Sequence, residues 1–160
     1  AFRNTYNMPI IITHTMNVIG ERQHPEKFLP KIINHIVSKK TLTIHSDKFK
    51  KTAGSRFYIH AQDVADAIRF ILRNGKLGEK YNIVGVKEIN NLELARIVSK
   101  HLNRKLLYKF VDFHSSRPGH DLRYALSGQK LKKMGWRPKK NIVQRIKDTV
   151  NWTLKNKEWL

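Results

Sequence analysis

The chain has 160 residues, of which 40% are hydrophobic, and 32 Lys and Arg against 12 Asp and Glu give it a formal charge of +20. This hydrophobic content supports a buried core and excludes wholesale disorder, and the length suits one domain, or one domain and a fragment of another. No apolar run reaches the roughly 18 residues of a membrane span. The absence of cysteine excludes disulfides and thiolate metal sites.

Apolar periodicity, β-branched runs and turn residues divide the chain into alternating strands and helices. In the first half they predict a frayed helix end at 2–7, a buried strand at 9–15, a polar loop at 17–24, a helix at 26–38, a strand at 41–46, a mobile basic loop at 47–54 and a strand at 56–60. In the second half they predict helices at 61–73, 91–102, 127–134 and 141–157, strands at 81–84 and 105–111, and a loop at 112–121 with a short extended piece at Tyr124. The alternation indicates an α/β fold rather than a helical bundle.

The predicted helix at 61–73 is strongly amphipathic. Val64, Ile68, Ile71 and Leu72 fall on one side of it. We therefore expect this side to face the core.

The positive charge by itself suggests nucleic acid as one partner, because neutralised phosphates release counterions. Lysines are, however, spread over nearly every segment, and the densest clusters, at 48–51, 132–133 and 137–140, are short. Scattered lysines are usually solvated, although their field attracts any anion, nucleotide diphosphates included. The sequence has no recognised nucleic-acid motif. We expect a cytoplasmic protein with neither nucleic acid nor a membrane as its partner.

Two motifs of nucleotide-cofactor enzymes do not occur in the chain. It has no glycine-rich GxGxxG loop, and none of its five tyrosines is followed four residues later by lysine. The histidines lack a metal-binding spacing such as HExxH. Taken alone, these residues assign no catalytic group and no metal.

Three segments of the sequence stand out in order along the chain: NVIG at 17–20 with QHPEKFLP at 23–30, SRFYIHAQDVA at 55–65, and SRPGHDLRY at 116–124. These segments resemble the nucleotide-sugar 4,6-dehydratases of the extended short-chain dehydrogenase superfamily, above all those of the dTDP-glucose type. GEKYNI at 78–83 and GWRP at 135–138, followed by Trp152 and Trp159, fit as well. The likeness covers essentially the whole chain and only the C-terminal half of the family.

The resemblance implies the last part of a Rossmann-type domain over residues 1–20, followed by a small mixed α/β substrate-binding domain over residues 21–160. It implies NAD as the cofactor of the full-length family, and a dTDP- or UDP-glucose substrate converted to a 4-keto-6-deoxy sugar nucleotide. In the family, the glycine-rich loop and Tyr-x-x-x-Lys lie upstream of the equivalent of Ala1. We therefore expect a truncated product, an expressed fragment or one half of a split enzyme, inactive alone, whose partners are a nucleotide-diphosphate sugar and a missing N-terminal half. Relatives form a homodimer through helices of that half, so the resemblance leaves a homodimer of this chain open.

Family likeness also implies roles for ten residues in binding the substrate. Asn17 would contact sugar hydroxyls, Glu26 and Lys27 would begin a helix that faces the diphosphate, and Thr43, Ile44 and His45 would lie against the base. Arg56 would grip the diphosphate, Asn82 would contact the nucleotide, and Arg117 and His120 would close over phosphates and ribose. Met16 and Val18 stand where the family has Ser and Asn, which removes polar contacts near the cofactor.

Three alternatives remain open from the sequence. The chain is also compatible with a non-catalytic remnant that binds nucleotide sugars, with an epimerase or decarboxylase of the same superfamily, and, less well, with a basic nucleic-acid binder. The sequence selects neither thymidine nor uridine as the base and sets no oligomeric state.

Overall fold

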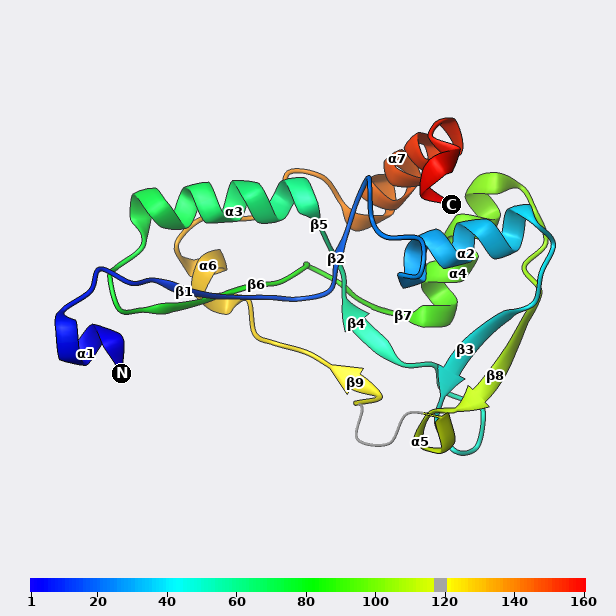
Figure 1. Ribbon diagram of the computed structural model, residues 1–160, viewed down its shortest axis with the longest axis horizontal. Helices are drawn as coiled ribbons and strands as arrows, with labels where there is room; N and C mark the ends of the chain where they lie inside the picture. The colour runs from blue at the N-terminus through cyan, green and yellow to red at the C-terminus, as the bar shows by residue number, and fades with distance from the viewer. Residues whose placement is uncertain (117–120) are drawn as a thin grey trace.

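Parallel pairing between strands far apart in the sequence organises the fold (Figure 1). The computed structural model describes residues 1–116 and 121–160. Three parallel pairs join β1 (Ile12–Thr15) to β6 (Lys80–Ile83), β2 (Val18–Ile19) to β5 (Ile59–His60), and β3 (Leu42–Ser46) to β8 (Tyr108–Asp112). Parallel strands need long crossovers, which here contain helices. The α/β class predicted from the sequence is confirmed.

A fourth, three-stranded sheet has β4 (Ser55–Phe57) at its centre. β4 pairs antiparallel with β7 (Glu88–Asn90) and parallel with β9 (Arg123–Tyr124). The helices are α1 (Phe2–Tyr6), α2 (Phe28–Val37), α3 (Ala61–Asn74), α4 (Asn91–Leu102), α5 (Phe113–Ser116), α6 (Gln129–Lys133) and α7 (Ile142–Lys155), followed by the 3-10 turn η1 (Lys157–Trp159). Among the described residues, no helix has the length and apolar character needed to cross a bilayer.

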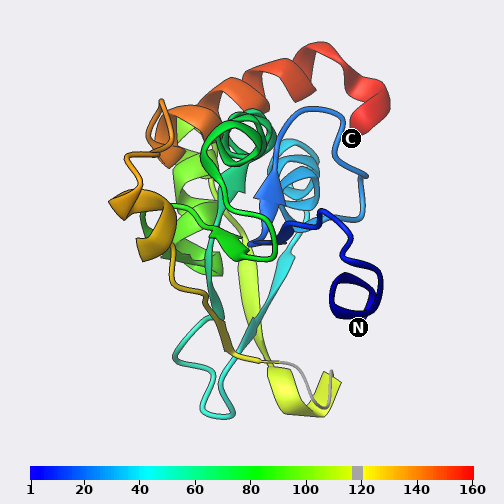
Figure 2. The ribbon, with the colours of Figure 1, turned by 90° about the vertical axis from the view of Figure 1, so that its left-hand side faces the viewer.

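The apolar core lies in two clusters. The larger one packs α2, α4 and α7 around β3, with Ile33, Ile44, Leu94 and Ile146 fully buried. The smaller one lies between α3, β6 and α6 and ends at Trp136. Figure 2 shows the longer helices gathered at one end, while β3 and β8 extend away from them toward α5.

The prediction of a buried strand at 9–15 is wrong in its extent and its burial. β1 begins only at Ile12, and its first three residues are exposed, with Ile12 43% accessible. Successive residues of a strand face opposite sides of its sheet, so three exposed residues in a row mean that neither face of β1 is well covered by the described part of the chain. On α3, likewise, Ile71 is buried whereas Ile68 and Leu72 are exposed, so half of the expected apolar side faces outward.

The other differences from prediction are short strands and a short helix. The loop predicted at 17–24 contains β2, the strand predicted at 56–60 breaks at Tyr58 into β4 and β5, and the region 112–121 contains α5. The basic loop at 47–54 is organised by Asp47, whose carboxylate accepts backbone hydrogen bonds from Thr52 (3.0 Å) and Lys51 (2.7 Å). These two bonds lower the pKa of Asp47. The predicted domain boundary at residue 20 remains a prediction.

A buried ion pair joins α3 to α7. Arg145 donates from Nε and Nη2 to the two carboxylate oxygens of Asp63, at 2.9 and 2.6 Å, and from Nη1 to Gln62 at 2.6 Å. Both charged side chains are almost fully buried. The loss of one partner would leave the other charge buried and uncompensated, which is far more costly than the pair is worth.

We predict that Asp63→Ala lowers the free energy of unfolding by about 3–5 kcal/mol. The double variant Asp63→Leu/Arg145→Met should recover most of this loss, because it leaves no charge unpaired. Urea unfolding of the two variants measures both effects. Glu93→Gln, which breaks the exposed pair with Lys87, is the control and should cost less than about 1 kcal/mol. A loss from Asp63→Ala no larger than this control would contradict the assignment.

His60 caps the start of α3 from a buried position. Its Nδ1 accepts a hydrogen bond from the backbone of Gln62 (3.2 Å), and its Nε2 lies 3.2 Å from the carboxylate of Glu21. Burial lowers the pKa of His60 below its ordinary 6.5, against the opposing pull of Glu21. The imidazole is therefore neutral in the folded chain at neutral pH.

The depressed pKa predicts a loss of stability as the pH falls. Below the unfolded-state pKa of 6.5 the unfolded chain binds a proton that folded His60 does not, so the free energy of unfolding drops by up to about 1.4 kcal/mol per pH unit until the folded pKa is reached. Urea unfolding at pH 7.5 and about 5.5 measures the slope. His60→Asn, which retains a capping group, should show a shallower slope than the wild type. Equal slopes for the two proteins would contradict this prediction.

Candidate functional site

Arg56 on β4 is the predicted site residue whose contacts are most completely defined. Its Nη1 donates to the carbonyl oxygens of Ser55 (2.5 Å) and Leu122 (2.9 Å), and its Nη2 donates to that of Asp121 (2.8 Å). The side chain is half-buried. These three bonds hold the guanidinium against the segment that enters β9, so its orientation is fixed by the main chain.

β3 and the turn before Arg56 lie next to each other. The carbonyl of His45 accepts a hydrogen bond from the backbone of Gly54 (3.2 Å), two residues before Arg56. The His45 ring is half-buried and meets the Phe113 ring edge-on, with centroids 5.9 Å apart. Thr43 is half-buried, whereas Ile44 is fully buried in the core and offers a ligand only its main chain.

Asn17 is exposed directly before β2, and Glu26 and Lys27 are exposed at the start of α2. Lys27 is the N-cap of this ten-residue helix and makes no side-chain capping bond. The first N–H groups of a helix are unsatisfied within the helix and favour anions. The Asn17 carbonyl accepts a hydrogen bond from Ile59 (3.1 Å), which fixes the backbone of β2 against β5.

Asn82 lies on β6 and donates from Nδ2 to the carbonyl of Ser127 (3.1 Å). Its amide therefore ties β6 to the start of α6, and its oxygen is the group left for a ligand. Arg117 and His120 lie outside the described residues. The roles predicted for all ten residues remain predictions.

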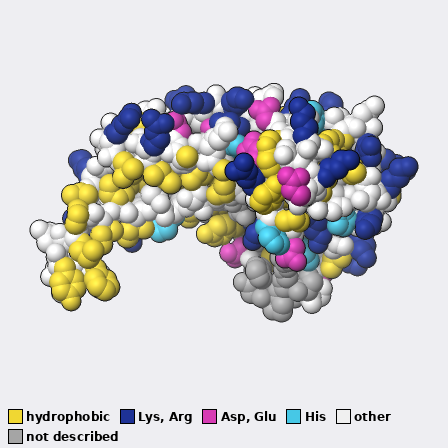
Figure 3. Space-filling model, turned by 45° about the horizontal axis from the view of Figure 1, so that its top comes forward, with side chains coloured by type: hydrophobic (Ala, Val, Ile, Leu, Met, Phe, Trp, Pro, Cys, Tyr) yellow, Lys and Arg dark blue, Asp and Glu magenta, His cyan; other side chains and the backbone are white. Residues whose placement is uncertain are grey.

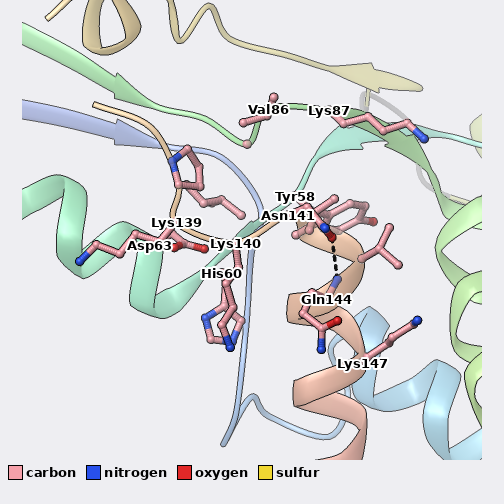
Figure 4. A pocket seen from close by; sticks show the side chains of 15 residues that line it. Tyr58, His60, Asp63, Val86, Lys87, Lys139, Lys140, Asn141, Gln144 and Lys147 are labelled. Carbon is pink, nitrogen blue, oxygen red and sulfur yellow. Dashed lines mark hydrogen bonds between the residues drawn. The ribbon is translucent and has the colours of Figure 1, made fainter. Parts of the chain in front are cut away.

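A cavity of about 510 Å³ lies between the start of α7, β5 and the turn 85–87 (Figure 4). Lys87, Lys139, Lys140 and Lys147 are among the residues that line it. A second cavity, of about 320 Å³, shares Gly85, Val86 and Pro138 with it. Neither cavity is lined by a predicted site residue. Inside the first, Tyr58 donates to Asn91 (2.7 Å), and burial raises its pKa, so its phenol is a structural donor rather than a base.

Two charged groups of structural importance were missed from the sequence. Asp63 precedes Ala67 and Ile71 at four-residue spacing on α3, and Arg145 precedes Thr149 and Thr153 in the same way on α7. In each helix a charged residue thus shares a face with buried residues, and this pattern is the signal from which a buried ion pair could have been predicted. By contrast, the local sequence pattern does not indicate the contacts of Glu88 on β7, because these contacts link three strands that are far apart in the sequence.

The comparisons with known proteins agree with this architecture. The model of the NAD dependent epimerase/dehydratase family matches residues 1–84. The chain is 37% identical over 159 residues to the trifunctional UDP-glucose 4,6-dehydratase/UDP-4-keto-6-deoxy-D-glucose 3,5-epimerase/UDP-4-keto-L-rhamnose-reductase of Arabidopsis thaliana, covering 99% of this chain and 23% of that protein. It is 32% identical to dTDP-glucose 4,6-dehydratase of Escherichia coli, covering 99% of this chain and 46% of the enzyme.

A solved structure gives the same picture. DesIV, the dTDP-glucose 4,6-dehydratase of Streptomyces venezuelae, crystallised with NAD and TYD bound, is 33% identical and superposes with a TM-score of 0.85 over 99% of this chain and 48% of its own. The chain thus spans about half or less of the length of these relatives. Sequence and fold together show that the chain belongs to the NAD-dependent epimerase/dehydratase family.

Proposed function

We propose that this chain binds the nucleotide diphosphate of a dTDP- or UDP-sugar and is the substrate-binding portion of a nucleotide-sugar 4,6-dehydratase. The observation that carries the proposal is the state of Arg56. Three of its five N–H donors bind carbonyl oxygens, and the other two have no acceptor among residues 1–116 and 121–160. A guanidinium held in this way offers a fixed pair of donors, which suits two phosphate oxygens.

Two other features of the chain are compatible with a nucleotide ligand. Lys27 adds a full positive charge at the uncapped start of α2, and β3 brings His45 to the turn that precedes Arg56. In Figure 1 the start of α2, β4 and the end of β3 all lie in the right-hand part of the molecule. Relatives crystallised with nucleotide ligands, such as DesIV with TYD, make a nucleoside diphosphate the natural probe.

NAD is the cofactor of the family, and DesIV was crystallised with it, but the residues of this chain do not fit an NAD site. Met16 is buried and apolar, Val18 is apolar, and the chain has no glycine-rich loop to hold a dinucleotide. We therefore assign no step to NAD here. This chain contributes binding energy remote from the reacting sugar, which supports catalysis by positioning.

The exposed edge at β1 is where we place the rest of the enzyme. Phe2, Tyr6, Ile12 and Leu72 are exposed apolar residues of α1, β1 and α3. Figure 3 shows hydrophobic side chains gathered toward one end of the molecule. A further α/β unit, on the same or another polypeptide, would cover this surface. It would also supply the cofactor site and the Tyr-x-x-x-Lys pair of the family.

Binding should depend on Arg56. In calorimetric titrations with dTDP and UDP, we expect saturable binding by the wild type, at least tenfold weaker binding by Arg56→Ala, and an intermediate loss for Arg56→Lys, because lysine lacks the paired donors. Arg73→Ala, on the exposed end of α3, is the charge-matched control and should change affinity less than twofold. If the Arg56 and Arg73 variants lost the same amount of affinity, binding would reflect the net charge of the chain and not a specific contact with Arg56. Binding of a DNA duplex in preference to dTDP, with steep salt dependence, would favour a nucleic-acid function instead.

We also predict that the chain alone does not turn over dTDP-glucose or UDP-glucose, because its 160 residues lack the Tyr-x-x-x-Lys pair. Chromatographic detection of the 4-keto-6-deoxy product is the measurement. Turnover above a no-protein blank, by protein free of host dehydratase, would overturn this division of labour. Nucleotide binding without turnover, even after the complementary unit is supplied, would instead identify a non-catalytic binding protein.

A further inference from the structure

Glu88 spans the three-stranded sheet from one edge to the other. It lies on β7, yet its carboxylate accepts from Ser55 Oγ on the central strand β4 (2.6 Å) and from Nε and Nη2 of Arg123 on β9 (2.8 and 2.9 Å). One side chain thus joins both neighbours of β4. The hydrogen bonds from Arg123 and Ser55 lower the pKa of Glu88, so the carboxylate is charged at neutral pH.

The strand that Glu88 anchors is short. Among the described residues, β9 pairs with β4 through two residue pairs, Ser55 with Arg123 and Arg56 with Tyr124. Just before these pairs, the Leu122 carbonyl accepts a hydrogen bond from the Ser55 backbone (3.0 Å). The two-point contact between Glu88 and Arg123 adds a side-chain link to this short pairing and helps to fix the place of β9 beside β4.

β9 in turn fixes Arg56. The acceptors that orient its guanidinium include the carbonyls of Asp121 and Leu122, the two residues that lead into β9. A shift of β9 would move these oxygens and release the guanidinium. Glu88 thus holds Arg123, Arg123 helps to place the backbone that enters β9, and the carbonyls of that backbone orient Arg56.

We propose that Glu88 is a positioning residue of the nucleotide-diphosphate site, acting on Arg56 through Arg123 and β9; this rests on the function proposed above. Glu88 touches no ligand in this arrangement. Its contribution is preorganisation, because a guanidinium already held in place loses less conformational freedom when it binds. A partly exposed ion pair of this kind adds little to stability, so its effect on binding is expected to exceed its effect on folding.

Calorimetric titration of dTDP into the full chain tests the proposal. We expect Glu88→Ala and Arg123→Ala each to weaken binding about threefold, equivalent to about 0.6 kcal/mol, and the double variant to be no weaker than either single one. Glu88→Gln, which keeps an acceptor but loses the charge, should fall between Glu88→Ala and the wild type. Glu93→Gln, which breaks a comparable surface pair with Lys87, is the matched control and should bind as the wild type does.

Hydrogen exchange separates failure of this proposal from failure of the function. Loss of Glu88 should speed exchange of the Ser55 amide, whose acceptor is the Leu122 carbonyl at the entry to β9, while the cooperative melting transition is retained. If the wild type binds neither dTDP nor UDP, the proposed function and the positioning role both fall. If the wild type binds dTDP and the Glu88 and Arg123 variants keep both its affinity and its exchange rates, only the positioning role is overturned.

Discussion

The carbonyl oxygens of Asp121 and Leu122 and the guanidinium of Arg56 form the contact on which the proposed site depends. It joins residues 65 and 66 positions apart in the chain, and it converts a long, flexible cation into one with a set direction. A free arginine on a basic surface would attract phosphate without discrimination. An arginine bound on one side to the main chain presents its remaining donors in one geometry, which is the requirement for recognising a diphosphate.

The net charge of the chain attracts anions, whereas Arg56 is proposed to select among them. The 12 acidic residues cannot neutralise 32 Lys and Arg one for one, and several of them are already paired locally, as Glu79 is with Lys130 and Asp148 with Lys140. On the face shown in Figure 3, Lys and Arg side chains are spread over the upper and right-hand parts rather than gathered in one stripe. Such a field draws anions toward the molecule but does not choose among them. Selection falls to oriented groups such as Arg56.

Much of the fold could be predicted from local pattern, because long helices with one apolar face and β-branched strands announce themselves within a few residues. The helix over 61–73 is an example, confirmed as α3 (Ala61–Asn74). The break at Tyr58 could not be foreseen, since it arises from the pairing of β4 and β5 with different partners. The exposure of Ile12 could not be predicted either. A β-branched run indicates a tendency to be buried, but not whether other elements cover the strand.

The candidate site was less accessible to sequence reasoning than the fold. Arg56 entered through family resemblance, whereas its carbonyl acceptors and the bridging role of Glu88 depend on three strands meeting, which no local spacing reports. The most direct test of the account is an experimental structure of the chain with dTDP. Diphosphate oxygens should lie within hydrogen-bonding distance of Arg56, with its bonds to Asp121 and Leu122 intact. A diphosphate bound elsewhere, or an Arg56 that has left those carbonyls to reach it, would contradict the account.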